Sequence, residues 1–326
     1  MKKITLLSAI ATTMASSAFA ALTIEPYSYV DSSYTTETFM VTGSGGISDF
    51  TTYTYASLYF ESATVAFNSS QALTLTSTSQ ATGALSVSNG SAWYPIVMKN
   101  STLTFSNGGS LITGNAANAI SIYKSNVLST ITVEATAGTV KVNKVFANTG
   151  KLVFNLYKEN SLTHYSASSA TLVGGVSTTG CLELNMTANQ NLKFDLRNNA
   201  RATLGITNGA VLTFNGFSVN TSGGFATILL STDDLSDGKI FFANTSTQWG
   251  ASSWNAATGA LSLTESTKTY TLYFKASDGT TVADLDWVET TGGWYLETPV
   301  PEPAAYAAIF GALALGFAAW RKRKQG

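Results

Sequence analysis

The residue types that carry most enzyme chemistry are sparse in this chain. His164, in the sequence LTHYS, is the single histidine, so a metal site built from several histidines is excluded. A Ser-His-acid triad would need an exposed serine, and no serine lies in a G-x-S-x-G turn. We therefore interpret His164 as a surface or strand residue, and we expect no catalytic residue and no cofactor.

Acidic residues gather in two short segments, STDDLSDGKI (231–240) and KASDGTTVADLDW (275–287). Ca²⁺ prefers such oxygen ligands, but an EF-hand loop that begins at Asp233 would place Leu235 at its third position and Asn244 at its twelfth. Asp-Gly pairs commonly close β-turns. We predict turns at both segments and assign no metal site, although a structural Ca²⁺ stays open. The acids concerned are Asp233, Asp234, Asp237, Asp278, Asp284 and Asp286.

A polysaccharide-cleaving site is the remaining enzymatic alternative. Asp195 and Arg197 share one face of an expected strand, and Arg201 follows. Cleavage by a carboxylate pair needs two acids at a defined distance, and only Glu183 lies near Asp195 in sequence. A solvated strand face explains these residues more simply.

Four tryptophans are candidates for stacking on sugar rings, provided that they are exposed, although core packing is the usual role of this side chain. They are Trp93, Trp249, Trp254 and Trp294.

The composition favours an exported protein. Charged residues are 11% of the chain, and Ser, Thr, Asn and Gly supply the other polar positions. The formal net charge is −1, but cations are concentrated at the two ends, so the remainder is mildly acidic and carries no basic footprint for nucleic acid. The single cysteine, Cys181, excludes an intramolecular disulfide. In TTGCLELNM it falls on the strand face opposite Leu182, and we interpret it as a structural thiol.

Strand-like runs fill the segment between the ends, because apolar residues recur at i and i+2. Asn-Gly pairs punctuate these runs and predict corners or hairpins. The runs begin at Leu73, Leu85, Leu103, Ile131, Leu152, Leu182, Leu192, Leu212 and Ile228, and the Asn-Gly pairs begin at Asn89, Asn107, Asn208 and Asn215. We predict an all-β body over residues 21–298.

Two architectures fit this pattern. The spacing between runs is irregular and close to the roughly 20 residues that one coil of a parallel β-helix needs, which favours an irregular right-handed β-helix or solenoid. The alternative is an antiparallel β-sandwich. Residues 21–66 suit an N-terminal cap or first sheet, and the segment from Lys239 to Glu297 suits a cap at the other end, with TTGG (290–293) as a hairpin turn. Sequences such as Ser101–Ile122 resemble the passenger regions of autotransporters and other secreted β-helices.

The N-terminus carries an export address. In MKKITLLSAIATTMASSAFA two lysines precede an apolar stretch, and Ala18-Phe19-Ala20 forms an A-x-A cleavage site. These features predict a Sec signal peptide over residues 1–20, cut by signal peptidase between Ala20 and Ala21.

The C-terminus, residues 299–326, has three parts in a fixed order. Pro301, Glu302 and Pro303 come first, in a segment whose prolines favour extended backbone. An apolar run over 304–320 follows and predicts a transmembrane helix. Its end is marked by four cations, Arg321, Lys322, Arg323 and Lys324, which would stop transfer and stay cytoplasmic.

This order of motifs resembles the PEP-CTERM sorting signal. The resemblance covers Val300–Gly326 and implies an exported protein that the C-terminal helix holds in the inner membrane until an exosortase, a membrane-embedded processing enzyme, acts on it. It further implies a destination at the cell surface or in the extracellular matrix of a Gram-negative bacterium that makes a biofilm. It carries no information on the fold of the body.

The expected function is therefore structural, adhesive or polysaccharide-associated, and not enzymatic. The expected partners are signal peptidase, an exosortase-like enzyme, the inner membrane during transit, and an extracellular polysaccharide. A polysaccharide lyase or hydrolase on a β-helix is the alternative.

Overall fold

The computed structural model describes the greater part of the body and the C-terminal helix. The described residues are 20–27, 38–46, 57–68, 72–75, 85–86, 93–94, 96–112, 120–122, 128–142, 144–146, 150–163, 170–173, 181–195, 200–218, 224–231, 235, 238–243, 253–265, 268–299 and 303–324. Across these ranges the regular structure is β-strand, apart from one C-terminal helix, α1 (Pro303–Arg323). The prediction of an all-β body is confirmed.

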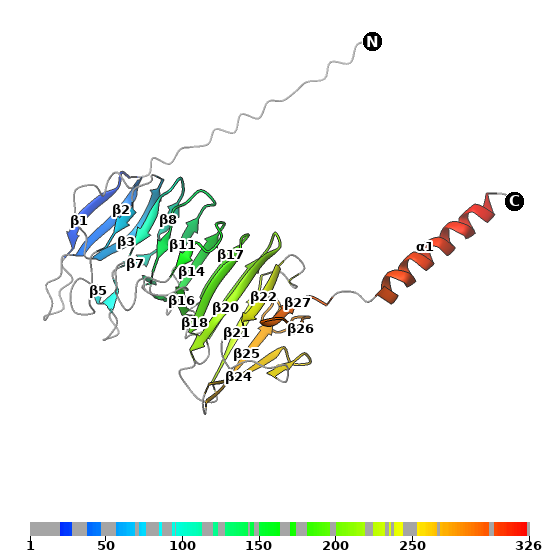
Figure 1. Cartoon of the computed structure of the whole chain (residues 1–326). Helices are drawn as coiled ribbons and strands as arrows, with labels where there is room; N and C mark the ends of the chain where they lie inside the picture. The colour runs from blue at the N-terminus through cyan, green and yellow to red at the C-terminus, as the bar shows by residue number, and fades with distance from the viewer. Residues whose placement is uncertain are drawn as a thin grey trace, which may run out of the picture.

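The strands are joined side by side into long parallel ladders, and Figure 1 shows them following one another along the length of the body. Ladder 1 runs through β8 (Thr102–Phe105), β11 (Leu128–Val133), β14 (Lys151–Leu156), β17 (Cys181–Met186), β19 (Ala200–Ile206), β21 (Gly224–Leu230) and β25 (Lys268–Lys275). Ladder 2 runs through β7 (Ile96–Lys99), β10 (Ile120–Ile122), β13 (Lys144–Phe146), β16 (Ala170–Val173), β18 (Gln190–Asp195), β20 (Ala210–Ser218) and β22 (Gly238–Ala243). Ladder 3 is shorter and joins β4 (Ala72–Thr74), β9 (Ser110–Ile112), β12 (Val140–Lys141) and β15 (Leu162–Thr163).

The chain visits the ladders in a fixed order. From β8 to β15 it passes from ladder 1 to ladder 3, then to ladder 2, and back to ladder 1 beside its previous strand. The return takes 23 residues from Thr132 to Asn155 and 30 residues from Asn155 to Asn185. After β17 the described strands alternate between ladders 1 and 2 alone, because ladder 3 ends with β15.

A long strand begins the two main ladders together. The first half of β3 (Ser57–Phe67) pairs with β7, and its second half pairs with β8. We call each passage of the chain through the ladders a rung. The bend between the halves of β3 falls at Ser62, whose φ is 50°, and the matching bend in the next rung falls at Asn100, whose φ is 49°. The Asn100 Nδ2 donates to Ser62 Oγ across 3.4 Å. In these two rungs, a residue with left-handed backbone therefore directs the chain from ladder 2 into ladder 1.

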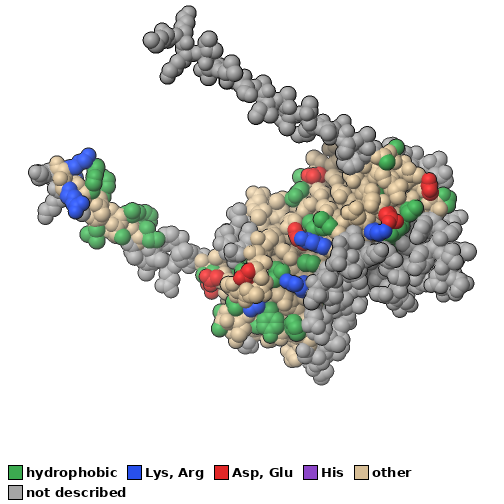
Figure 2. Space-filling model, turned by 180° about the vertical axis from the view of Figure 1, so that it is seen from behind, with side chains coloured by type: hydrophobic (Ala, Val, Ile, Leu, Met, Phe, Trp, Pro, Cys, Tyr) green, Lys and Arg blue, Asp and Glu red, His purple; other side chains and the backbone are tan. Residues whose placement is uncertain are grey.

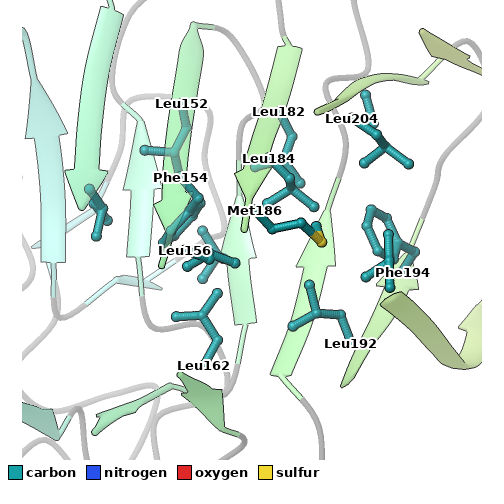
Figure 3. Close-up of a cluster of buried hydrophobic side chains, with 14 of the residues drawn as sticks. Leu152, Phe154, Leu156, Leu162, Leu182, Leu184, Met186, Leu192, Phe194 and Leu204 are labelled. Atoms are coloured by element: carbon teal, nitrogen blue, oxygen red, sulfur yellow. The ribbon is translucent and has the colours of Figure 1, made fainter. Parts of the chain in front are cut away.

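The interior is filled by every second side chain of each strand. In β14 and β17 the burial alternates strictly, and Leu152, Phe154 and Leu156 lie beside Leu182, Leu184 and Met186 of the next strand, all at most 1% exposed. Figure 3 shows these side chains pointing between the ladders, together with Leu192 and Phe194 of β18. Because equivalent positions stack directly, like side chains form continuous rows, such as Phe67 on Phe105 with ring centroids 4.7 Å apart.

Four polar side chains are buried in the described part of the body, and hydrogen bonds explain each of them. Ser101 Oγ accepts from the N–H of Ala63 and donates to the carbonyl of Lys99, while Ser129 Oγ accepts from the N–H of Ser101. Gln190 accepts from the N–H of Ser161 and donates to the carbonyl of Lys158 across 2.7 Å. These residues satisfy backbone groups that the corners leave without a strand partner.

Antiparallel strands cover both ends of the stack. At the N-terminal end β1 (Thr23–Tyr27) pairs antiparallel with β2 (Thr38–Gly46), which is itself parallel to β3. At the C-terminal end β24 (Ala260–Glu265) and β23 (Trp254–Asn255) extend ladder 1, and β27 (Gly293–Glu297) and β26 (Asp286–Thr290) extend ladder 2. The short pair β5 (Leu85–Ser86) and β6 (Trp93–Tyr94) forms a separate sheet.

The strand and turn predictions can be compared with these elements. All nine predicted runs fall on strands, and the TTGG turn joins β26 to β27 with Gly292 at φ of 92°. Asn107-Gly108 and Asn208-Gly209 form corners with positive φ. Asn89-Gly90 lies outside the described residues.

The turn predicted at Asn215-Gly216 is wrong, because these residues lie inside β20. The register between β18 and β20 shifts here, with Leu192 opposite Phe214 and Phe194 opposite Phe217. One extra residue in β20 is accommodated as a bulge, the other backbone irregularity that Asn-Gly tolerates.

Candidate functional site

The C-terminal helix covers the segment that the sequence indicated, with slightly different bounds. Pro301 and Glu302 lie outside the described residues, whereas Pro303 is the first residue of α1 and not part of an extended segment. Proline is favoured at a first helical position because its missing N–H would have no partner there. The helix also continues past residue 320 through Arg321, Lys322 and Arg323, since basic side chains suit a helix C-terminus. Lys324 lies just beyond it, with Nζ 4.5 Å from the ring centroid of Trp320.

The large apolar side chains of α1 face outward. Six of them are more than half exposed, and Figure 1 shows the helix apart from the strands. Figure 2 shows the apolar side chains along the helix shaft and the cations at its end. The six are Ile309, Phe310, Leu313, Leu315, Phe317 and Trp320. Among the described residues no helix combines the length and the apolar character that crossing a bilayer takes, so the predicted transmembrane helix over 304–320 is not confirmed.

The body ends just before this helix. The last strand, β27, is bonded to β22, and Glu297 forms an ion pair with Lys239. Thr298 Oγ1 then accepts from the N–H of Leu235 across 2.8 Å. Four residues, 299–302, separate Thr298 from the start of α1.

The predicted N-terminal processing site adjoins the first strand. Ala18 lies outside the described residues, but the carbonyl of Ala20 accepts from the N–H of Ser44 across 2.9 Å, and Ala21 forms a bridge with Ser44. The predicted cut between Ala20 and Ala21 would therefore remove the bond from Ser44 to Ala20 and leave the bridge of Ala21. The cut itself stays a prediction.

The two carboxylates considered for catalysis are not brought together. Glu183 lies on β17 in ladder 1, and Asp195 lies on β18 in ladder 2, so their strands belong to different sides of the stack. Arg201 lies on β19 in ladder 1. Other residues that were considered for catalysis, metal binding or sugar stacking lie outside the described ranges: His164, Arg197, Asp233, Asp234, Asp237 and Trp249.

Glu183 belongs to a polar row on the outward face of ladder 1. It forms an ion pair with Lys151 and accepts from Asn185 Nδ2 across 3.1 Å. The row continues from Asn185 to Asn155 and from Asn155 to Thr132, each step a hydrogen bond of 3.1 Å between neighbouring strands. Burial raises the pKa of Glu183, but the bonds from Lys151 and Asn185 and the charge of Lys151 outweigh it, so the pKa lies below its usual value. The arrangement stabilises an ionised carboxylate and the stacking of three strands.

The second acidic segment forms a turn, as predicted. Asp278 Oδ1 accepts from the N–H groups of Thr280 and Thr281 at 2.7 and 2.8 Å, and Oδ2 accepts from the Thr281 hydroxyl. The Thr281 hydroxyl bond and the two N–H bonds hold the pKa of Asp278 far below its usual value. Asp284 and Asp286 are exposed. In the part of the chain that the structure describes, no three His, Cys, Asp or Glu residues gather in a way that could hold a metal ion.

The tryptophans of the C-terminal end pack on one another. Trp287 stacks on Trp294 with ring centroids 6.0 Å apart and on Trp254 at 6.5 Å. Trp294 is 8% exposed, so it cannot stack on a sugar in this conformation. The side chain of Trp93 lies outside the described residues.

An exposed aromatic side chain lies elsewhere, at a position that we had not considered. Phe225 of β21 is 43% exposed, and its ring meets that of Tyr273 edge-on, with centroids 6.0 Å apart. In GFATILL the alternation places Phe225 in phase with Thr227, on the face opposite the buried Ala226 and Ile228. The sequence alone could therefore have indicated this exposed side chain, because a large aromatic residue occupies an outward position of the strand.

Comparisons with known proteins returned no matching protein family, no matching curated protein and no matching solved structure.

Proposed function

We propose that this chain is an exported cell-surface or extracellular-matrix protein whose C-terminal segment is a PEP-CTERM-type sorting signal. Signal peptidase removes residues 1–20, and the C-terminal segment delivers the body, through the inner membrane, to an exosortase-like processing enzyme. The body then acts as a structural or adhesive spacer that is associated with extracellular polysaccharide. No catalytic step is part of this proposal.

We infer further that the body is an irregular right-handed parallel β-helix. The parallel pairing of ladders 1 and 2 supports this architecture over an antiparallel sandwich, as does the fixed order in which the chain visits the ladders. Parallel crossover connections are right-handed in nearly all proteins, which supports the handedness.

The register of ladder 1 gives a direct test of this architecture. Thr132→Cys combined with Asn155→Cys, in a Cys181→Ser background, should form a disulfide on oxidation, because these positions are direct neighbours in the parallel register. The pair Thr132→Cys and Asn185→Cys, two strands apart, serves as the control and should stay reduced. The inverse pattern of cross-linking would exclude the stacked arrangement.

The observation that carries the sorting proposal is the separation of body and helix. Among the described residues, Thr298 forms the bond of the body that lies nearest to the helix, and α1 begins five residues later with large apolar side chains that are exposed. Such a helix needs another apolar environment, and the basic residues at its end suit a position beside anionic membrane lipids.

The C-terminal peptide of the mature protein tests the sorting proposal. We expect mass spectrometry of the cell-surface and matrix fraction to find a C-terminus at or near residues 301–303, and we expect that terminus to be lost when the processing enzyme is deleted. A protein that keeps residues 321–326 and stays in the membrane fraction would refute the proposal.

The alternative of a polysaccharide-active enzyme gains no support from the described residues. Its two candidate carboxylates, Glu183 and Asp195, belong to different ladders, and Glu183 is already bound by Lys151 and Asn185.

A further inference from the structure

The outward face of ladder 1 changes character towards its C-terminal end. From β14 to β17 its charges are paired, as in Lys151 with Glu183. The next three strands of the ladder, β19, β21 and β25, carry Arg201, Phe225, Thr227, Tyr273 and Lys275 on the same face. We call these five residues the aromatic–basic face.

Register and burial establish that these side chains share one face. Arg201 lies opposite Thr227, and Thr227 lies opposite Tyr273 in the next strand. The alternating positions in the same strands are core residues, and Ala202, Ala226, Ile228, Leu272 and Phe274 are all 0% exposed. Since successive side chains of a strand point to opposite sides, the five residues point away from the core.

The two cations on this face have no acidic partner in the described part of the chain. Lys275 places Nζ 6.0 Å from the ring centroid of Tyr273, and no ion pair joins Lys275 or Arg201 to a described carboxylate. Arg201 reaches the turn at Gly279, where a Cβ would lie 3.6 Å from its Nη2. The neighbouring acid, Asp278, accepts hydrogen bonds from Thr280 and Thr281 with both of its carboxylate oxygens. By contrast, Lys99 pairs with Glu61 and Lys239 pairs with Glu297 elsewhere in the body.

We propose that the aromatic–basic face binds an acidic polysaccharide, one whose sugar residues carry carboxylates. An exposed aromatic edge-on pair gives a pyranose ring an apolar surface. Arg201 offers a planar fork that matches a carboxylate, and Lys275 offers a second positive charge two strands away and two residues further along the strand. Hydroxyls of Thr227 and of Thr271, which lies opposite Phe225, supply partners for sugar hydroxyls.

The geometry favours an extended polymer. The strands of a ladder repeat about every 4.8 Å, so equivalent positions form a flat, evenly spaced track across β19, β21 and β25. A linear glycan laid across the strands would meet these positions in succession. The chain as a whole is mildly acidic, with a sequence pI near 5.9, so the attraction for a carboxylated glycan is local to Arg201 and Lys275 and should weaken as salt is added.

This inference deepens the proposed function, since it rests on a polysaccharide partner at the cell surface. Its test is nevertheless independent of sorting. The full chain, kept in solution with a mild detergent, is titrated with alginate, a linear polyuronate, in calcium-free buffer of low ionic strength. Neutral dextran and a single-stranded oligothymidylate are the comparison polymers.

Two variants and a matched control locate the binding. Arg201→Gln combined with Lys275→Gln should weaken alginate binding about tenfold or more, the scale expected from losing two charge-assisted contacts. Phe225→Ser should weaken it by roughly fivefold through the lost stacking surface. Lys193→Gln, which removes an outward cation from β18 in ladder 2, should leave the affinity unchanged. Thermal melts of each variant verify that the fold is retained.

Three results would overturn the inference: alginate binding that both variants leave unchanged, equal binding of the oligothymidylate, or no alginate binding at low salt. A C-terminus that is never processed would refute the sorting proposal and leave these titrations intact. Loss of alginate binding in the variants would support the aromatic–basic face whatever the route of export.

Discussion

Gln190 is a buried amide that uses both ends of its side chain. Its carbonyl oxygen accepts from the N–H of Ser161, and its amide nitrogen donates to the carbonyls of Lys158 and Ala188. Gln190→Leu would keep the volume but leave these backbone groups without partners. We expect a loss of about 1–3 kcal/mol in the free energy of unfolding, measured by urea denaturation.

Lys193→Met in the same strand is the control for this substitution, because that side chain lies on the outward face. Its unfolding free energy should change by less than about 0.5 kcal/mol. Equal losses in the two variants would contradict the bridging role of Gln190.

The lowered pKa of Glu183 predicts how the stability of the folded chain changes as the pH falls. Its pKa is lower in the folded chain than in the unfolded chain, so its contribution to stability is complete above the unfolded pKa and is lost as the pH falls through the folded pKa. The Tm of the wild type should therefore exceed that of Glu183→Gln at pH 7, and the difference should shrink steadily below about pH 4. A difference that is constant from pH 7 to pH 3 would show that the charge of Glu183 is not responsible.

At the scale of the elements, two glycines in similar corners should differ in how strongly they respond to the same substitution. A Cβ on Gly109 would lie 1.9 Å from the carbonyl oxygen of Phe67 in the neighbouring rung, whereas a Cβ on Gly209 would meet nothing within 4 Å. Gly209 has φ of 68°, a conformation that asparagine tolerates.

We expect Gly109→Asn to lower the free energy of unfolding by roughly 1–3 kcal/mol or more, since backbone must shift to make room. Gly209→Asn should change it by less than about 1 kcal/mol. Urea denaturation of both variants measures the contrast, and similar values would mean that the corner at Gly109 is not closely packed.

These elements also show how far the sequence can be interpreted. The strands were predictable because each has one buried face, and an alternation such as that of Cys181–Met186 appears directly in the residues. The bulge at Asn215-Gly216 could not be predicted, because an Asn-Gly pair suits either a turn or a bulge. Pairing with the neighbouring strand decides between the two.

The sequence also does not reveal which side chains become neighbours in space. Whether Glu183 and Asp195 share a face depends on which ladder each strand joins, and that depends on the number of corners between them. Sequence distance carries no such information. For the same reason the approach of Phe225 to Tyr273, across strands that are distant in sequence, could not be foreseen.

At the scale of the whole molecule, the body should not depend on the C-terminal helix. The bond formed by Thr298 lies before the expected processing site. A chain that ends at residue 300 should therefore melt within about 1–2 °C of the full chain, since the described large apolar side chains of α1 are exposed.

A chain that ends at residue 292 is the contrast, because it lacks β27 and exposes the edge of β22. Differential scanning calorimetry should show a clearly lower Tm for this shorter chain. If the chain that ends at residue 300 were destabilised as much, the helix would be part of the fold.

The stacking of the rungs has a mechanical consequence. The hydrogen bonds between rungs run along the stack, so a pull between its ends loads the rungs in series, one after another (Figure 1). Each rung up to β15 is held by three ladders, and each described rung beyond β17 by two. The later strands of ladders 1 and 2 are longer and offset the missing ladder, so the rungs should yield one at a time at similar forces. Under tension the molecule would work as an extensible strap, and optical tweezers would record this as a staircase of small, reversible extensions.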